Sequence, residues 1–211
     1  MIKTHSATSF AYQEQLFVQQ VFEPFEHLGY ETRNKYRISD NSNKEIFFVA
    51  EQQKGFLGFL FRQWLGHARR SFHLNFFNPN REVVYQAKHP FRFFFQELEV
   101  YDSKGKAIGG MKQKFAILRR RFHIIDRNGN TLMEVRTRMR LILPVWHFPF
   151  IKNNQQVATV DKKFFGLLTE LMTDKDNFMV TMQNEKISET ERILILASAI
   201  FIDIRYFETK R

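Results

Sequence analysis

Four arginines stand at spacings that suit the binding of an anion. They flank the turn signal DRNGN at 126–130 and are Arg119, Arg121, Arg136 and Arg138. Asn128 and Gly129 favour a two-residue type I′ turn, and counting back from that turn places each arginine opposite another one. The expected pairs are Arg121 with Arg136 and Arg119 with Arg138. Side chains alternate between the faces of a strand, so all four should project from one face.

Two interpretations of this basic face stay open. Like charges directly opposite each other destabilise a strand pair mildly, so the cluster calls for acidic neighbours or an anionic ligand. Alternatively, the long arginine side chains simply splay into solvent on an exposed sheet face. Arg140, Lys112 and Lys114 extend the face by their position in the sequence. The hypothesis is therefore an anion-binding set of Arg119, Arg121, Arg136, Arg138 and Arg140.

A second group of residues resembles a calcium ligand set. The stretch DKDNFMVTMQNE at 174–185 contains the oxygen ligands Asp174, Asp176, Asn177 and Glu185. Three of them match positions one, three and twelve of a calcium-binding loop, but the template's glycine is replaced by Met179 and a ligand position by Phe178. The alternative is that NFMVTMQ forms a strand after a turn. Calcium is thus the one metal or cofactor that the sequence suggests.

No catalytic constellation is apparent in the sequence. The seven histidines show no metal-ligand spacing, and there is no cysteine for a zinc site or a thiol nucleophile. The nine glycines form no nucleophile elbow, dinucleotide turn or phosphate loop. We therefore expect a protein that is not an enzyme and name no catalytic residues.

Composition indicates one folded domain that attracts polyanions. The chain has 211 residues, 44% of them hydrophobic and 26% charged, and its 25 phenylalanines predict a core rich in Phe. The net charge of +10 favours nucleic acid or an anionic bilayer as partner. The chain lacks cysteine, and its first twenty residues show no secretory signal, so we expect a cytoplasmic protein. If it binds a membrane, we expect it to lie peripherally at the inner face.

Short β-branched and aromatic runs separated by turn signals predict a series of hairpins. The signals are SDNSNK at 39–44, NPNRE at 78–82, DSKGK at 102–106, DRNGN at 126–130 and KNNQQ at 152–156. Closing the hairpins into a barrel would remove exposed sheet edges. The segment 55–70 breaks this pattern and predicts a short amphipathic helix. Its Phe59, Phe61 and Trp64 either insert shallowly into a membrane or cap the barrel end.

The C-terminal stretch predicts a buried helix over about 188–207. Ser188 and Glu191 have the spacing of a capping box. The apolar or small run from Ile193 to Ile202 is broken only by Ser198 and falls short of the roughly 20 residues that span a bilayer. A helix that is apolar all round and too short to span is expected inside a larger structure.

Several segments, taken in order, resemble the phospholipid scramblase family, whose fold is similar to the tubby C-terminal barrel. They are ETRNKYRI at 31–38, FFVAEQ at 47–52, FQELEV at 95–100, DKDNF at 174–178 and the ending ILILASAIFIDIRYFE. The resemblance implies a mainly β protein, a closed antiparallel barrel of about twelve strands around the buried C-terminal helix. We expect a single domain over 1–211, with the barrel at about 12–187 and the helix at about 188–207.

The resemblance also implies binding to phospholipid membranes and calcium-dependent, ATP-independent movement of phospholipids between leaflets. The family's cysteine cluster is replaced here by HPFRFFFQ at 89–96. We expect Phe93, Phe94 and Phe95 to be core residues, and the alternative is that they touch a bilayer directly. The alternative is a soluble tubby-like binding or regulatory module whose basic face meets nucleic acid or a protein. The sequence carries no prediction of the oligomeric state.

Overall fold

The computed structural model describes residues 10–21, 34–52, 71–115, 119–138, 147–161 and 177–206. These ranges contain twelve strands, a short 3-10 helix and a long C-terminal helix. The elements are β1 (Gln15–Gln20), β2 (Lys35–Ser39), β3 (Glu45–Glu51), β4 (Phe72–Phe77), β5 (Val83–His89), β6 (Glu97–Asp102), β7 (Ala107–Lys114), β8 (Arg119–Asp126), β9 (Thr131–Arg138), β10 (His147–Lys152), β11 (Gln155–Asp161), β12 (Phe178–Met182), η3 (Asn184–Lys186) and α3 (Glu189–Tyr206).

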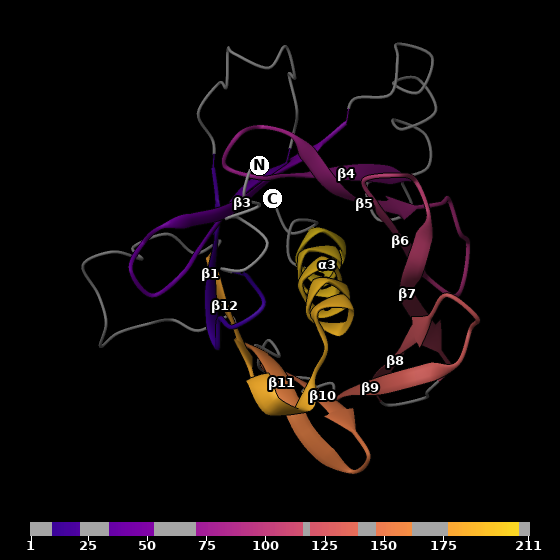
Figure 1. Cartoon of the computed structure of the whole chain (residues 1–211). Coiled ribbons are helices and arrows are strands. Elements are labelled where there is room, and N and C mark those ends of the chain that lie inside the picture. The colour runs from indigo at the N-terminus through magenta and orange to yellow at the C-terminus, as the bar shows by residue number, and fades with distance from the viewer. Residues whose placement is uncertain are drawn as a thin grey trace.

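The strands close into an antiparallel barrel with α3 inside it. Each strand pairs with its neighbours in sequence, and β1 pairs with β12 to complete the circle. The view along the barrel shows α3 at its centre, surrounded by the strands (Figure 1). The mainly β barrel around a C-terminal helix is therefore confirmed.

The barrel core is built from the inward side chains of the strands and from all sides of α3. In β1 buried residues alternate with partly exposed ones, as expected of a strand with one buried face. Every residue from Ile193 to Ile202 has at most 1% of its surface exposed. This segment of the helix, apolar or small on all sides, is stable here because the strands surround it. Among the described helices, none has the length and apolar character needed to cross a membrane.

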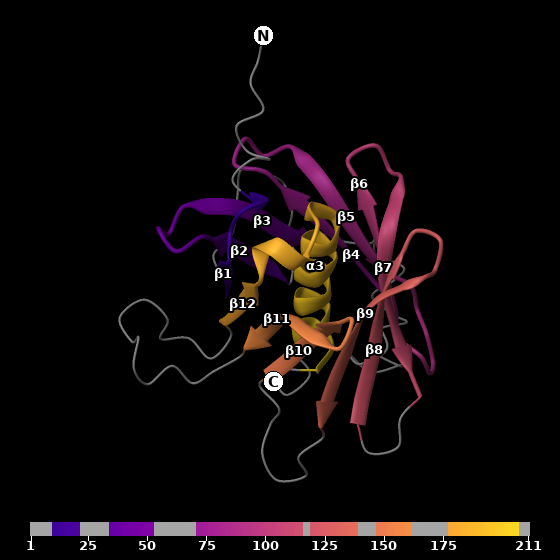
Figure 2. The same ribbon diagram turned by 60° about the horizontal axis from the view of Figure 1, so that its bottom comes forward.

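Successive connections of this barrel lie at alternate ends, because each strand runs antiparallel to the next. We call the end that carries the β2–β3, β4–β5, β6–β7, β8–β9 and β10–β11 connections the turn end. The opposite end, where β5 leads to β6 and β7 to β8, is the loop end. The helix α3 follows β12 at the turn end and runs toward the loop end (Figure 2). Near the loop end Tyr36 Oη donates a hydrogen bond to Asp203 of α3 at 3.0 Å.

Four hairpin turns at the turn end share one geometry. Each begins with Asp or Asn, whose backbone oxygen accepts a bond from the amide three residues on and whose side-chain oxygen accepts from the amide four residues on. The residue three positions on has a positive φ. The initiating residues are Asp40, Asn78, Asp102 and Asp126. Four of the five predicted turn segments therefore share a local mechanism, an Asx turn that ends in the left-handed conformation, whereas the β10–β11 turn has two consecutive residues of positive φ, Asn153 and Asn154.

The capping box predicted from Ser188 and Glu191 is present at the start of α3. The Ser188 amide donates to Glu191 Oε2 at 2.8 Å, and the Glu191 amide donates to Ser188 Oγ at 3.3 Å. Lys152 Nζ also lies 2.7 Å from Glu191 Oε1, which ties the β10–β11 hairpin to the helix. Burial would raise the pKa of Glu191, but the bonds from Lys152 and Ser188 outweigh it and hold that pKa below its ordinary value of 4.5.

Glu191→Gln should lower the free energy of unfolding at pH 7 by about 1 kcal/mol, because the amide forms a weaker cap and no ion pair. A depressed folded pKa makes the carboxylate's contribution complete above 4.5, and that contribution is lost as the pH falls through the folded pKa. The difference between the two proteins should therefore shrink in acid. Urea unfolding followed by circular dichroism at pH 7 and below pH 4.5 measures this. Glu185→Gln, an exposed neighbour with the same charge change, should have almost no effect.

Candidate anion-binding site

The predicted arginine pairs are observed in the register of β8 and β9. Arg121 is paired with Arg136 and Arg119 with Arg138. The intervening positions Phe122 and Val135 are buried, so Arg121 and Arg136 project from the outer face. On the next strand Lys114 is paired with Arg121. We call Lys114, Arg121 and Arg136, together with the strand positions of Arg119 and Arg138, the basic face.

The turn that joins β8 and β9 differs from the predicted two-residue type I′ turn. Asp126 rather than Arg127 closes it, through the bond from its amide to Asn130 O, and Gly129 has a φ of +87°. This is a three-residue turn with a bulge, and the register shifts between Ile124 and Ile125. The shift restores the register that the two-residue turn would have given. The predicted turn type is thus wrong, whereas the arginine pairs are the predicted ones.

The charges of the basic face are only partly balanced. Arg136 donates from Nε and Nη2 to Glu134 Oε2 at 2.6 and 2.5 Å. This hydrogen bond lowers the pKa of Glu134 against the opposing effect of burial, and the charges of Arg136, His123 and Arg121 add to it. Within the described ranges, Arg121 and Lys114 form no salt bridge with an acid. The face therefore keeps exposed positive charge close to the loop end.

His123 lies among the basic residues, and their charges affect its pKa. Its Nε2 is 3.9 Å from Glu134 Oε1, and its Nδ1 is 3.2 Å from Thr131 Oγ1. Burial lowers the pKa of His123, Glu134 opposes this, and the charges of Lys114, Arg121 and Arg136 lower that pKa further. The imidazole is accordingly neutral at pH 7, and an anion on this face would make its protonation easier.

The structure does not bring the described members of the calcium set together. Asn177 is buried just before β12, whereas Glu185 is exposed in η3 after it. The strand β12 lies between them, as the alternative interpretation predicted. An extended strand rises roughly 3.3 Å per residue, so it keeps Asn177 and Glu185 apart. Across the described ranges no three His, Cys, Asp or Glu side chains gather as a metal site. Asp174 and Asp176 lie outside the described residues, as do Arg140, Phe59, Phe61 and Trp64.

The prediction that Phe93, Phe94 and Phe95 are core residues is wrong. Their exposed fractions are 58%, 83% and 53%, and Phe91 and Phe115 are also exposed. These residues lie in the β5–β6 and β7–β8 connections at the loop end. An abundance of phenylalanine indicates a Phe-rich core but does not say which phenylalanines belong to it. Three consecutive phenylalanines cannot all face inward from a strand, and Pro90 precedes them, so the sequence did hold a signal for an exposed loop.

The amino-acid sequence is similar to a known protein family and to several named proteins. The family described as Scramblase matches residues 2–209. A phospholipid scramblase family protein of Schizosaccharomyces pombe is 26% identical, with 92% of this chain and 58% of the relative aligned. Phospholipid scramblase 2 of Bos taurus is 25% identical, with 94% of this chain and 70% of the relative aligned.

A relative with a different description is also similar. Altered inheritance rate of mitochondria protein 25 of Saccharomyces cerevisiae is 22% identical over 85% of this chain and 66% of its own length. The chain thus spans about six tenths of the fission yeast protein and just under two thirds of the budding yeast one. No solved structure matches the chain significantly.

Proposed function

The chain belongs to the scramblase family, and from this premise we propose that it docks on anionic phospholipid membranes and moves phospholipids between leaflets without ATP. The observation that carries the docking proposal is the basic face, where Arg121 lies opposite Arg136 and beside Lys114. Cytoplasmic location, at the inner face of a membrane, is part of the same proposal, because that leaflet carries the anionic lipids.

The geometry of the basic face suits phosphate groups at a bilayer surface. Adjacent strands lie about 4.8 Å apart, so side chains from β7, β8 and β9 form a compact, rigidly spaced array. Arginine can donate two parallel bonds to one phosphate, and each basic residue near an anionic surface contributes about 1 kcal/mol. Binding of this kind weakens as salt screens the charges.

Lys114→Ala with Arg121→Ala should weaken binding to anionic vesicles by about tenfold to thirtyfold at low salt, since two contacts of about 1 kcal/mol each are lost. Co-sedimentation with vesicles of phosphatidylserine and phosphatidylcholine, and with phosphatidylcholine alone, measures this. The matched control is Lys104→Ala with Lys106→Ala, which removes two exposed charges at the turn end. Equal losses in both double variants would indicate a nonspecific charge effect and overturn the assignment of the face.

The same experiment separates membranes from other polyanions. Duplex DNA at matched salt is the competitor, and preference for DNA over anionic vesicles would favour a nucleic-acid module instead.

His123 supplies a second readout of binding to the basic face. Its pKa, followed by NMR, should rise when anionic vesicles or short-chain phosphatidylserine occupy the face, because the ligand offsets the nearby positive charges.

Lipid movement requires a separate experiment with the full chain in vesicles. Fluorescent phospholipid placed in both leaflets becomes accessible to an external quencher if the chain exchanges the leaflets, with no ATP added. We propose that calcium regulates this activity and that the segment containing Asp174 and Asp176 binds it. Exchange that is the same with calcium and with chelator would overturn the calcium proposal, and absence of exchange would overturn the transport proposal while leaving docking intact.

A further inference from the structure

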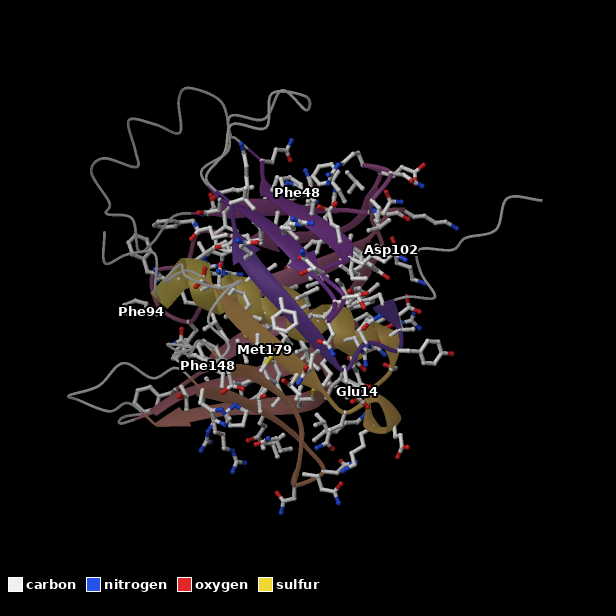
Figure 3. The ribbon with its side chains drawn as sticks, turned by 90° about the vertical axis from the view of Figure 1, so that its left-hand side faces the viewer. Glu14, Phe48, Phe94, Asp102, Phe148 and Met179 are labelled. Carbon is white, nitrogen blue, oxygen red and sulfur yellow. The ribbon has the colours of Figure 1, made fainter. Side chains whose placement is uncertain are left out.

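The loop end of the barrel carries a cluster of exposed aromatic side chains. Of the six large hydrophobic side chains that are exposed in the described ranges, five lie at this end. We call them the aromatic tip: Phe91, Phe93, Phe94, Phe95 and Phe115. Figure 3 shows Phe94 and Asp102 at opposite ends of the barrel, which separates the aromatic tip from the turn end. Exposed apolar surface gathered in one place is characteristic of an interaction site.

The backbone that presents the aromatic tip is fixed by hydrogen bonds to the barrel. Gln96 Nε2 donates to Phe94 O at 2.8 Å, and the Gln96 amide donates to Gln113 Oε1 at 3.2 Å. The Gln113 amide donates to Gln96 O at 2.8 Å, which links the β5–β6 connection to β7. Phe91 and Phe93 pack edge to face, with ring centroids 4.8 Å apart. The rings of Phe91 and Phe93 and the backbone that carries Phe94 are thus preorganised, which lowers the entropic cost of docking.

Positive charge stands immediately beside the aromatic tip. Arg92, between the exposed phenylalanines, and Lys112 share the carboxylate of Glu97 at 3.0 and 3.1 Å, so this trio keeps a net charge of one. Lys114 precedes Phe115 directly and is paired across the strands with Arg121. Aromatic rings flanked by basic side chains match the bilayer interface, where rings enter the boundary between headgroups and acyl chains and cations meet phosphates.

We propose that the barrel docks end-on, with the aromatic tip inserted into the interface of an anionic phospholipid bilayer and the basic face turned toward the headgroups. This inference rests on the proposed membrane docking and specifies its orientation and depth. The rings form a tip that is bordered by Lys114, by Arg121 and by the trio of Arg92, Lys112 and Glu97, whose net charge is positive. The partner must therefore supply both apolar depth and many negative charges, which a bilayer does and a protein groove does not.

The absence of cysteine makes the insertion directly measurable. Phe94→Cys and, as a control at the turn end, Lys104→Cys each carry a single environment-sensitive NBD label in the full chain. With phosphatidylserine-containing vesicles, the label at 94 should shift to the blue and be quenched by nitroxides placed on the upper acyl chain. The label at 104 should keep its emission in water. Quenching at 104 and not at 94 would reverse the proposed orientation.

Affinity supplies an independent test. Phe94→Ser with Phe115→Ser should weaken vesicle binding at least tenfold, and the loss should persist at high salt, unlike that of Lys114→Ala with Arg121→Ala. Tyr12→Ser is the matched control, since Tyr12 is an exposed aromatic residue before β1 at the turn end. All these side chains are exposed, so each variant should unfold at the wild-type temperature.

The outcomes distinguish this inference from the proposed function. Binding to vesicles with the 94 label still in water overturns end-on insertion but leaves membrane docking in place. No binding by the wild-type chain overturns both. A blue shift at 94 that depends on protein concentration and needs no vesicles would assign the aromatic tip to contact with a second copy of the chain and overturn the bilayer as its occupant.

Discussion

Gly110→Ala should lower the free energy of unfolding by about 3 kcal/mol or more, the largest single-methyl effect that we expect in this chain. A Cβ at position 110 would stand 2.0 Å from Leu98 O and 3.1 Å from Leu98 C. Both neighbours are backbone atoms of β6, the strand that pairs with β7. A flexible side chain could move aside, but this backbone cannot retreat without loosening the β6–β7 pairing. Closure of the barrel depends on that pairing.

The matched control for Gly110→Ala is Ala107→Val, because it adds methyl groups to the same strand at an exposed position. That variant should stay within about 0.5 kcal/mol of the wild type. Urea unfolding monitored by circular dichroism gives both values, and amide exchange in β6 and β7 shows whether the loss is centred there. Equal stabilities for the glycine and alanine proteins would mean that the two strands are farther apart than described.

The neighbouring glycine explains why the helix can approach the sheet at this place. At Gly109 a Cβ would meet Ile125 O at 2.4 Å and the side chain of Leu194 at 2.9 Å, and φ is +150°. Leu194 belongs to α3, so Gly109 marks a point where the helix packs against the barrel wall with no side chain between them. Gly109 therefore serves the fit of the helix, whereas Gly110 serves the close pairing of β6 with β7.

The sequence predicted the architecture well because local signals and burial agree. The capping box at Ser188 and Glu191 marks the start of the helix, and the apolar run after it must be buried, which the hairpins achieve by surrounding it. The arginine pairs followed from counting, although the turn contains one more residue than assumed. Turn type depends on whether Asp126 bonds to its own turn, a choice that dipeptide preference at Asn128 and Gly129 does not reveal.

Prediction was weakest where residue type and environment disagree. Phenylalanine is usually buried, and most described phenylalanines are, so Phe94 and its neighbours were expected inside. Their exposure follows from the topology, which places the β5–β6 connection at a barrel end whose interior is already filled by α3. Phe115 was missed for the same reason. Exposed aromatics of this kind are recognised only after the strands have been placed.

Arg192 is a buried residue of α3 that binds the segment before β1 at the turn end. Its side chain is only 1% exposed, yet its Nε donates to Phe10 O at 3.2 Å and its Nη2 donates to Gln13 O. The guanidinium also lies 5.6 Å from the centre of the Phe10 ring, which packs edge to face on Phe47. Burial lowers the pKa of Arg192, and the charges of Glu189 and Glu14 oppose this.

Arg192→Ala should therefore lower the free energy of unfolding by about 3–5 kcal/mol, because two charge-assisted bonds and the packing of an almost fully buried side chain are lost. Arg192→Lys should fall between alanine and the wild type, since one ammonium reaches the two carbonyls less well than a planar fork does. Arg127→Ala removes an exposed arginine of the same size and should change stability by less than about 0.5 kcal/mol. Urea unfolding orders the four proteins. If lysine at 192 proved as stable as arginine, packing of the side-chain stem rather than the two bonds of the guanidinium would hold the N-terminal segment to α3.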